Sequence, residues 1–285
     1  MPITPTLEPQ AHGTLFLIGG GEKRQGSTII LDRLVESVKE AAKDRPTHRL
    51  VIIPTALKER PLEAAKSYKE FFLDRGLREV DIATIEQRSD ADNEKTAETI
   101  SEAAGIFLTG GDQIRLTSIL GGTRAFEALY NAYLNAATVG GTSAGASAMS
   151  ETMVSGGDVE PAPSREEVRM SPGLGLLPGV VIDQHFFQRR RIGRLVTVIA
   201  QNPRVLGLGI DEDTAVEVSR DGMMQVLGSG TVTVFDGSEI GYCNIGDSQG
   251  DGPLSLTNLI IHMLVAGHRF DTRKGQMADH LPIVE

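Results

Sequence analysis

The sequence predicts an α/β fold, in which a mostly parallel sheet is flanked by helices and antiparallel strands are added toward the C-terminus. Two patterns in the 285 residues predict it. Short apolar runs typical of buried strands first alternate with stretches at helical spacing. After about residue 205, strand-like runs follow one another closely, with tight turns such as Arg220-Asp221-Gly222 between them, which is typical of antiparallel strands.

The expected parallel strands are short apolar runs, each followed by a helical pattern. They cover residues 14–18, 49–54, 80–85, 105–109 and 137–139. The first helix is predicted from the helical spacing of Ile29, Ile30, Leu34, Val35 and Val38. Three of the strands end in glycine-rich turns, at the edge where open parallel sheets bind ligands.

The later elements are a strand, a long helix and several antiparallel strands. The strand is expected at 180–182 and the helix at 186–201, followed by strands at 205–210, 214–218, 223–227 and 231–235. Residues 155–175 are rich in Gly, Pro, Ser and charge, and predict a long loop that shapes the substrate site. No linker divides the chain, so we expect a flexible N-terminus at 1–12 and one catalytic domain at 13–285.

Composition excludes several classes of function. The net charge of −10 and the absence of Trp argue against a nucleic-acid partner. No apolar run approaches the ~20 residues of a membrane span, and residues 1–12 do not resemble a signal peptide. Cys243 is the only cysteine, which fits a reducing compartment and predicts a cytoplasmic protein.

Residues 141–145 read Gly-Thr-Ser-Ala-Gly, between an apolar run and a run of small residues. The pattern Gly-x-Ser-x-Gly between a strand and a helix predicts a nucleophile elbow with Ser143 at its tip. The alternative interpretation is a glycine-rich turn in which Ser143 only caps a helix. If Ser143 is a nucleophile, the backbone N–H groups of Ala144 and of Gly111 or Asp112 are expected to stabilise the oxyanion.

A serine nucleophile needs a base and an orienting acid. Of the six histidines, His185 is the best candidate base, because it follows strand 180–182 at what we expect to be the same sheet edge as Ser143. Three carboxylates, Asp211, Glu212 and Asp213, follow the strand at 205–210 and are the candidate acids.

Arginines follow His185 closely. Arg190 and Arg194 are four residues apart and Arg191 and Arg194 are three apart, so each pair can share a helix face. They predict either a charged outer face or a clamp for substrate carboxylates. Asp183 and His185 could bind a metal, but no third ligand stands out, so no metal is expected.

Five motifs occur in one order along the chain. They are Leu17–Glu22, Phe107–Gln113, Gly140–Ala146, Asp183–Phe186 and Gly209–Ala215. Together they resemble the cyanophycinase family of serine peptidases, which also includes the bacterial aspartyl dipeptidase. The resemblance extends over roughly residues 13–265.

The resemblance implies a fold like the class I glutamine amidotransferase sandwich, no cofactor, and a homodimer. It implies Ser143 as nucleophile, His185 as base and Glu212 as acid. It also implies a set of substrate-binding residues, namely Gln113, Asp183, Gln184, Arg189, Arg191 and Arg194. The implied substrate is cyanophycin, a polyaspartate chain that carries arginine on each side-chain carboxyl, and the implied product is the β-aspartyl-arginine dipeptide.

Three other functions compete with this one. The first is a related dipeptidase that acts on aspartyl dipeptides. The second is an esterase of the α/β-hydrolase type, using Ser143, an acid such as Asp211, and His262 or His268. The third is a binding module in which the elbow forms a ligand pocket without catalysis.

Overall fold

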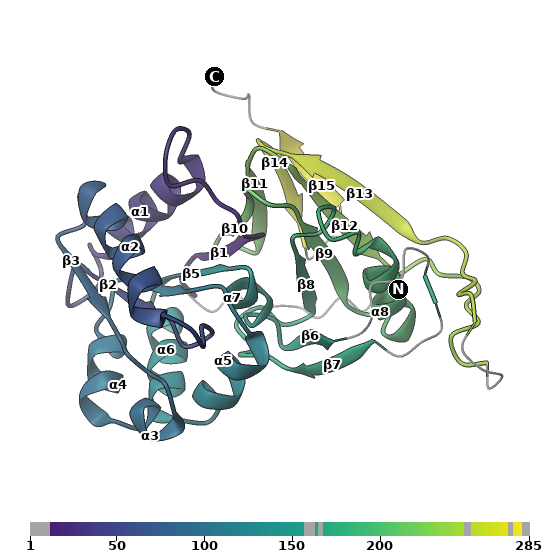
Figure 1. Ribbon diagram of the computed structural model, residues 1–285. Coiled ribbons are helices and arrows are strands. Elements are labelled where there is room, and N and C mark those ends of the chain that lie inside the picture. Colours follow the sequence, from purple (N-terminus) through teal and green to yellow (C-terminus); the bar gives the residue numbers. More distant parts are fainter. Residues whose placement is uncertain (1–11, 157–162, 165–167, 248–251, 273–275, 281–285) are drawn as a thin grey trace.

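The structure is a computed structural model that describes residues 12–156, 163–164, 168–247, 252–272 and 276–280 (Figure 1). Within these residues the largest sheet has nine strands. One half of it is parallel and consists, in spatial order, of β1 (Leu15–Ile18), β5 (Thr138–Thr142), β4 (Gly105–Leu108), β2 (Arg49–Ile53) and β3 (Glu79–Ile82). The expected mostly parallel sheet is confirmed. Strands β1, β2, β4 and β5 are buried almost throughout, as is typical of parallel strands covered on both faces, whereas the edge strand β3 exposes Glu79.

The other half of the large sheet is antiparallel and begins at β1. It consists of β10 (Thr214–Val218), β11 (Met223–Gly228), β14 (His268–Asp271) and β15 (Gln276–His280). A second sheet has the order β13 (Ile260–Val265), β12 (Thr231–Asp236), β9 (Leu206–Ile210) and β8 (Val180–Gln184). A small hairpin pairs β6 (Thr152–Gly156) with β7 (Arg169–Pro172).

Helices cover both faces of the parallel half and the outer face of the second sheet. They are α1 (Ile29–Ala41), α2 (Pro61–Asp74), α3 (Arg88–Ala91), α4 (Glu94–Ser101), α5 (Gln113–Leu120), α6 (Arg124–Leu134), α7 (Ala144–Ser147) and α8 (Ile192–Gln201). One core cluster packs α1 and α2 against one face of the large sheet. Another packs α5 and α6 and the second sheet against the opposite face, and a third lies under α8.

The second sheet packs against the antiparallel half of the large sheet, with α8 on its far side (Figure 1, right). The connection β8–α8–β9 is a crossover between two parallel strands, which needs a helix to return the chain to the same sheet edge. β9 is followed by β10, which belongs to the large sheet. The chain therefore passes from one sheet to the other at residues 211–213.

Several sequence predictions of local structure need correction. Strand 180–182 belongs to the second sheet, so His185 does not share a sheet edge with Ser143. The long helix begins at Ile192 instead of residue 186, since His185 and Arg190 have positive φ angles that no helix accommodates. Within the predicted loop 155–175, β7 is a strand, whereas residues 157–162 and 165–167 lie outside the described part.

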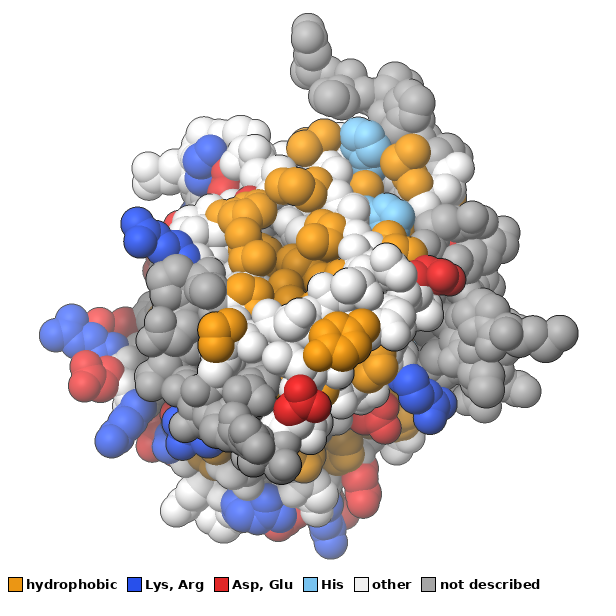
Figure 2. All heavy atoms as spheres, turned by 90° about the vertical axis from the view of Figure 1, so that its right-hand side faces the viewer, with side chains coloured by type: hydrophobic (Ala, Val, Ile, Leu, Met, Phe, Trp, Pro, Cys, Tyr) orange, Lys and Arg blue, Asp and Glu red, His pale blue; other side chains and the backbone are white. Residues whose placement is uncertain are grey.

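The sequence analysis also missed the strands β13, β14 and β15. Strand β13 is an edge strand that exposes the apolar side chains of Ile261, Met263 and Val265. Its exposed and buried positions are therefore both apolar, and the alternation of polar and apolar residues that predicts a strand is weak. Figure 2 shows hydrophobic side chains gathered on the side of the molecule that carries β13. Of the expected N-terminus 1–12, residues 1–11 lie outside the described residues.

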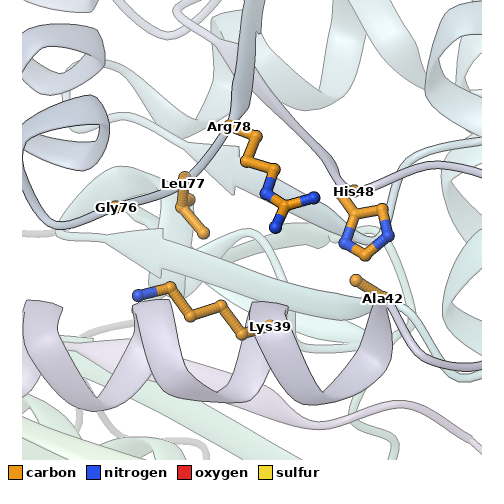
Figure 3. A pocket seen from close by; sticks show the side chains of 6 residues that line it. All are labelled: Lys39, Ala42, His48, Gly76, Leu77 and Arg78. Atoms are coloured by element: carbon orange, nitrogen blue, oxygen red, sulfur yellow. The ribbon is translucent and has the colours of Figure 1, made fainter.

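A small pocket of about 200 Å³ opens where β2 and β3 begin, at the sheet edge opposite to Ser143 (Figure 3). It is lined by Lys39, Ala42, His48, Gly76, Leu77 and Arg78. Lys39 Nζ donates a hydrogen bond to the carbonyl of Arg75, just after α2 ends. The basic side chains of this pocket lie where α1 and α2 end, and cations there offset the negative end of a helix dipole.

In the part of the chain that the structure describes, no helix is long and apolar enough to cross a membrane.

Substitution of Phe107 tests how much the core under the parallel half contributes to stability. It is fully buried on β4, with its ring 4.9 Å from that of Tyr68 and 5.4 Å from that of Phe72 on α2. We expect Phe107→Ala to lower the free energy of unfolding by about 3–5 kcal/mol, because it leaves a cavity between sheet and helix. Leu62→Ala, at an exposed position of α2, should cost less than about 0.5 kcal/mol. Urea denaturation of both variants measures the difference, and similar losses would contradict this view of the core.

Candidate active site

Ser143 lies at the tip of a strained turn between β5 and α7. Its backbone has φ 51° and ψ −113°, values that a residue with a side chain rarely adopts. Its N–H donates to the carbonyl of Ile18 at the end of β1. The turn also brings α7 close to β4, since a β-carbon added to Gly145 would lie 2.4 Å from the carbonyl oxygen of Leu108. This is the geometry of a nucleophile elbow, in which the side chain stands exposed above the sheet.

His185 reaches Ser143 from the second sheet. It follows β8, and its N–H donates to the carbonyl of Gly19, one residue beyond the carbonyl that holds Ser143. The backbone of His185 also has a positive φ, of 49°. A β-carbon added to Gly20 would lie 2.4 Å from the His185 ring, so only glycine leaves room for the imidazole at this point.

The three adjacent carboxylates after β9 have three different partners. Asp211 is buried and accepts hydrogen bonds from the N–H of Phe187 and from Thr231, so it joins β9, β12 and the turn after His185. Asp213 forms an ion pair with Lys23, with Nζ 2.8 Å from Oδ2. Glu212 is the member of the three that faces His185.

Ser143, His185 and Glu212 form a continuous chain of hydrogen bonds. Ser143 Oγ lies 3.0 Å from His185 Nε2, and His185 Nδ1 lies 2.7 Å from Glu212 Oε1. Because a carboxylate only accepts, the proton of the neutral ring belongs on Nδ1, which leaves the lone pair of Nε2 for the serine hydroxyl. The arrangement can perform nucleophilic catalysis with a general base oriented by an acid.

The electrostatic surroundings favour a neutral imidazole. Burial lowers the pKa of His185 below its ordinary value, and the charges of Arg189 and Arg191 lower it further. The hydrogen bond and charge of Glu212 act in the opposite direction and raise that pKa. The net effect is a lowered pKa, so His185 is ready to accept a proton from Ser143 at neutral pH.

Of the amide groups expected to bind an oxyanion, two remain available. Within the described residues, the N–H of Ala144 and that of Gly111 have no hydrogen-bond acceptor. Gly111 follows Gly110, where an added β-carbon would lie 3.4 Å from that of Ser143. The prediction for the N–H of Asp112 needs correction, because this group donates to the carbonyl of Ala56 at 2.9 Å. The carboxylate of Asp112 instead caps α5.

Two of the three predicted substrate arginines are bound inside the protein. Arg191 and Arg194 both donate to buried Asp183, and Arg191 also donates to the carbonyl of Gln184. Burial lowers the pKa of Arg191 to about 10, although Asp183 raises it. Arg191 and Arg194, which were expected to bind a substrate carboxylate, therefore bind the carboxylate of Asp183 in this structure. Arg189 is exposed.

The two predicted glutamines contact Ser143 and the backbone of the hairpin, respectively. Gln184 is buried, and its Oε1 lies 3.3 Å from Ser143 Oγ, so it is a second acceptor for the serine hydroxyl. Gln113 donates from Nε2 to the carbonyl of Val154 on β6, which attaches the hairpin to α5. Gln184 thus lies in the site itself, and Gln113 lies where the hairpin meets it.

The alternative with His262 or His268 as base does not fit the geometry. The His262 ring packs against Phe270, and His268 Nδ1 lies 3.0 Å from the carbonyl of Val265, in the antiparallel strands. Asp211, the acid of that alternative, already accepts hydrogen bonds from the N–H of Phe187 and the hydroxyl of Thr231. In the described part of the chain, no group of three His, Cys, Asp or Glu side chains could hold a metal ion.

Sequence reasoning missed a residue next to the turn of Ser143. Glu22 accepts a hydrogen bond from the hydroxyl of Thr142, which directly precedes Ser143. The only available signal was its place at the end of the first glycine motif, because Glu22 and Thr142 are 120 residues apart.

Comparison with known proteins matches the sequence to a family. The family model of peptidase family S51 matches residues 15–226. Cyanophycinase from Synechococcus elongatus is 36% identical over 279 residues, which cover 97% of this chain and 85% of that protein. Cyanophycinase from Geminocystis herdmanii is 37% identical over 271 residues, which cover 95% of this chain and 97% of that protein. Cyanophycinase from Trichormus variabilis is 38% identical over 265 residues, which cover 92% of this chain and 87% of that protein.

Among solved structures, a peptidase from an acI-B1 Actinobacterium has a TM-score of 0.66 at 22% identity, over 93% of this chain and 98% of that one. This likeness concerns the fold, and it agrees with the α/β architecture described above. The family match and the relatives both span Ser143, His185 and Glu212. The chain belongs to peptidase family S51 and is a serine peptidase.

Proposed function

We propose that this peptidase hydrolyses cyanophycin to β-aspartyl-arginine dipeptides through an acyl-enzyme on Ser143. The observation that carries the chemistry is the chain of hydrogen bonds from Ser143 through His185 to Glu212, at 3.0 and 2.7 Å. The substrate rests on the curated relatives, which bear the name cyanophycinase over nearly the whole chain.

In the acylation step, Ser143 Oγ attacks the backbone amide carbonyl between two aspartyl units while His185 Nε2 takes the hydroxyl proton. Glu212 stabilises the imidazolium that forms. The negative charge on the carbonyl oxygen is received by the N–H groups of Ala144 and Gly111. His185 then gives its proton to the leaving amine, and the acyl group remains on Ser143 as an ester.

In the second step, a water molecule attacks this ester, with His185 as its base. The dipeptide leaves with a free carboxyl group, and Ser143 regains its proton. The strained φ angles of Ser143 and His185 fit this role, because strain of this kind persists where surrounding contacts hold a residue for function.

Charge supports a substrate that carries carboxylates. Each unit of cyanophycin has a free carboxylate beside its guanidinium group. Arg189 is exposed near His185, and the cluster of Asp183, Arg191 and Arg194 keeps one net positive charge beneath it. We propose that Arg189 binds the substrate carboxylate directly, while Arg191 and Arg194 act mainly from their places on Asp183.

Two further properties stay predictions. The homodimer is expected to form through the exposed apolar strip of Ile261, Met263 and Val265 on β13, which carries no charge in a protein of net charge −10. Two acidic copies would repel each other least on such a surface. A cytoplasmic location is expected from the single cysteine, Cys243.

The first test addresses the triad. Ser143→Ala and His185→Ala should each reduce kcat at least about 10⁴-fold, and the double variant should be little worse, because the two residues act as one proton-transfer unit. Glu212→Gln should lose less activity than either, since Glu212 orients and stabilises the ring. Hydrolysis is measured on folded protein, as judged by circular dichroism. Substantial activity of His185→Ala would show that another group is the base.

The second test concerns pH. Since catalysis needs neutral His185, kcat/KM should rise as pH rises through the pKa of His185, which Arg189 helps to lower. Arg189→Gln removes a positive charge that opposes imidazolium, so the pKa rises and the acidic limb moves to higher pH. High salt should reduce the effect, because Arg189 is exposed.

The matched control is Arg190→Gln, which removes the neighbouring exposed charge that does not contribute to the pKa of His185. The pH–rate profiles of the two variants are compared at low and high salt. An equal displacement of the acidic limb in both would refute the specific role of Arg189.

The third test addresses the substrate. Purified enzyme is incubated with insoluble cyanophycin, α- and β-aspartyl dipeptides, and casein, and the products are identified by mass spectrometry. We expect β-aspartyl-arginine from cyanophycin and little cleavage of casein, because exposed Arg189 is proposed to bind the free carboxylate that each cyanophycin unit carries, which an ordinary peptide unit does not provide. If an aspartyl dipeptide is the best substrate, the related dipeptidase activity replaces this proposal.

A further inference from the structure

The side chain of Glu22 lies between the nucleophile turn and helix α2. Its Oε2 accepts a hydrogen bond of 2.7 Å from Thr142 Oγ1, and its Oε1 accepts one of 2.5 Å from the hydroxyl of Tyr68. Thr142 is 3% exposed, so its hydroxyl depends on this partner. Both oxygens of the carboxylate are thereby engaged, one by the strand of the nucleophile and one by the helix.

Tyr68 is itself well fixed. Its ring packs against Phe107, at 4.9 Å between centroids, and Arg24 lies over it at 4.8 Å. Burial and the charge of Glu22 hold the pKa of Tyr68 well above its ordinary value. The phenol therefore stays protonated and donates a hydrogen bond to Glu22. Glu22 is therefore anchored to the core of the protein as well as to the turn.

The same loop also contacts the other end of the triad. Lys23, the next residue, donates its backbone N–H to Asp213 and forms an ion pair with it. Asp213 directly follows Glu212, and its own N–H donates to the carbonyl of Gly20. One short segment thus contacts the residue before the nucleophile and the residue after the acid.

We propose that Glu22 is a positioning residue, which holds strained Ser143 in line with His185 through its hydrogen bond with Thr142. The inference rests on the proposed role of Ser143 as nucleophile. A turn with φ 51° and ψ −113° needs contacts on each side to persist. The carbonyl of Ile18 holds the N–H of Ser143, and Glu22 holds the side chain one residue before it.

Removing the contact should lower kcat more than it changes KM. A displacement of about 1 Å at a reacting atom can cost ~10²-fold in rate, so we expect Thr142→Val and Glu22→Ala to reduce kcat about 10- to 100-fold. The acidic limb of the pH profile should stay in place, because the charges that shift the pKa of His185 are those of Glu212, Arg189 and Arg191.

Two conservative variants should keep most of the activity that Thr142→Val and Glu22→Ala lose. Thr142→Ser keeps the hydroxyl. Glu22→Gln keeps one acceptor and gains a donor, and either hydroxyl partner can reverse its direction to match. The matched control is Thr138→Val, which removes another buried hydroxyl of β5, bonded to Ser37 at 2.8 Å, at the far end of the strand from Ser143.

The experiment measures two rates on each folded variant: phosphonylation of Ser143 by a fluorophosphonate probe, and hydrolysis of cyanophycin. We expect both rates to fall together in Thr142→Val and Glu22→Ala, with recovery in the conservative variants and nearly normal rates in Thr138→Val. Equal losses in Thr142→Val and Thr138→Val would overturn the inference about Glu22 but would leave the proposed function standing. Full hydrolysis by Ser143→Ala would overturn the proposed function, and this inference with it.

Discussion

The backbone at the end of β1 holds the site together. Three consecutive carbonyl groups, those of Ile18, Gly19 and Gly20, accept hydrogen bonds from the N–H groups of Ser143, His185 and Asp213. These donors come from β5 in the large sheet, from the end of β8 in the second sheet, and from the connection between the sheets. The relative positions of the proposed nucleophile, base and acid are thus fixed by one short segment of main chain, and the packing of the two sheets against each other keeps that segment in place.

The sequence predicted the parallel half of the fold well, because most of its strands are continuously buried and all are separated by helices. It did not predict that Val180–Gln184 belongs to a second sheet. An apolar run such as Val-Val-Ile is compatible with pairing in either sheet, and the partner, β9, lies beyond the helix α8. The predicted start of α8 was wrong because His185 and Arg190 have positive φ angles, which residue type alone does not report. At His185 the backbone N–H is held by the carbonyl of Gly19, which is far away in the sequence.

For the site, local motifs found the elbow and His185, and the resemblance singled out Glu212 among three adjacent acids. The structure gives a physical reason why the three carboxylates differ, since Thr231 and Lys23 occupy the other two. The arginines were harder to interpret. A run of arginines on a predicted helix does not reveal that Asp183, buried at the end of the preceding strand, binds Arg191 and Arg194. Such partners follow from packing, which a charge pattern does not contain.

The buried cluster of Asp183, Arg191 and Arg194 also connects the binding of charge with the strength of the base. Two buried guanidinium groups without a carboxylate partner would be costly to bury, and the charge of one of them, Arg191, lowers the pKa of His185. With Asp183 present, one positive charge remains, and Arg189 adds a second at the surface. In the proposed mechanism, this residual charge attracts the carboxylate of a substrate unit and favours the negative oxygen that forms during acyl transfer. Glu212 acts against this charge at the imidazole, because its hydrogen bond and its charge raise the pKa of His185. In the proposed mechanism, substrate binding and base strength therefore depend on the same few side chains, so replacing Arg189 or Arg191 to fit another substrate would also change the pKa of His185.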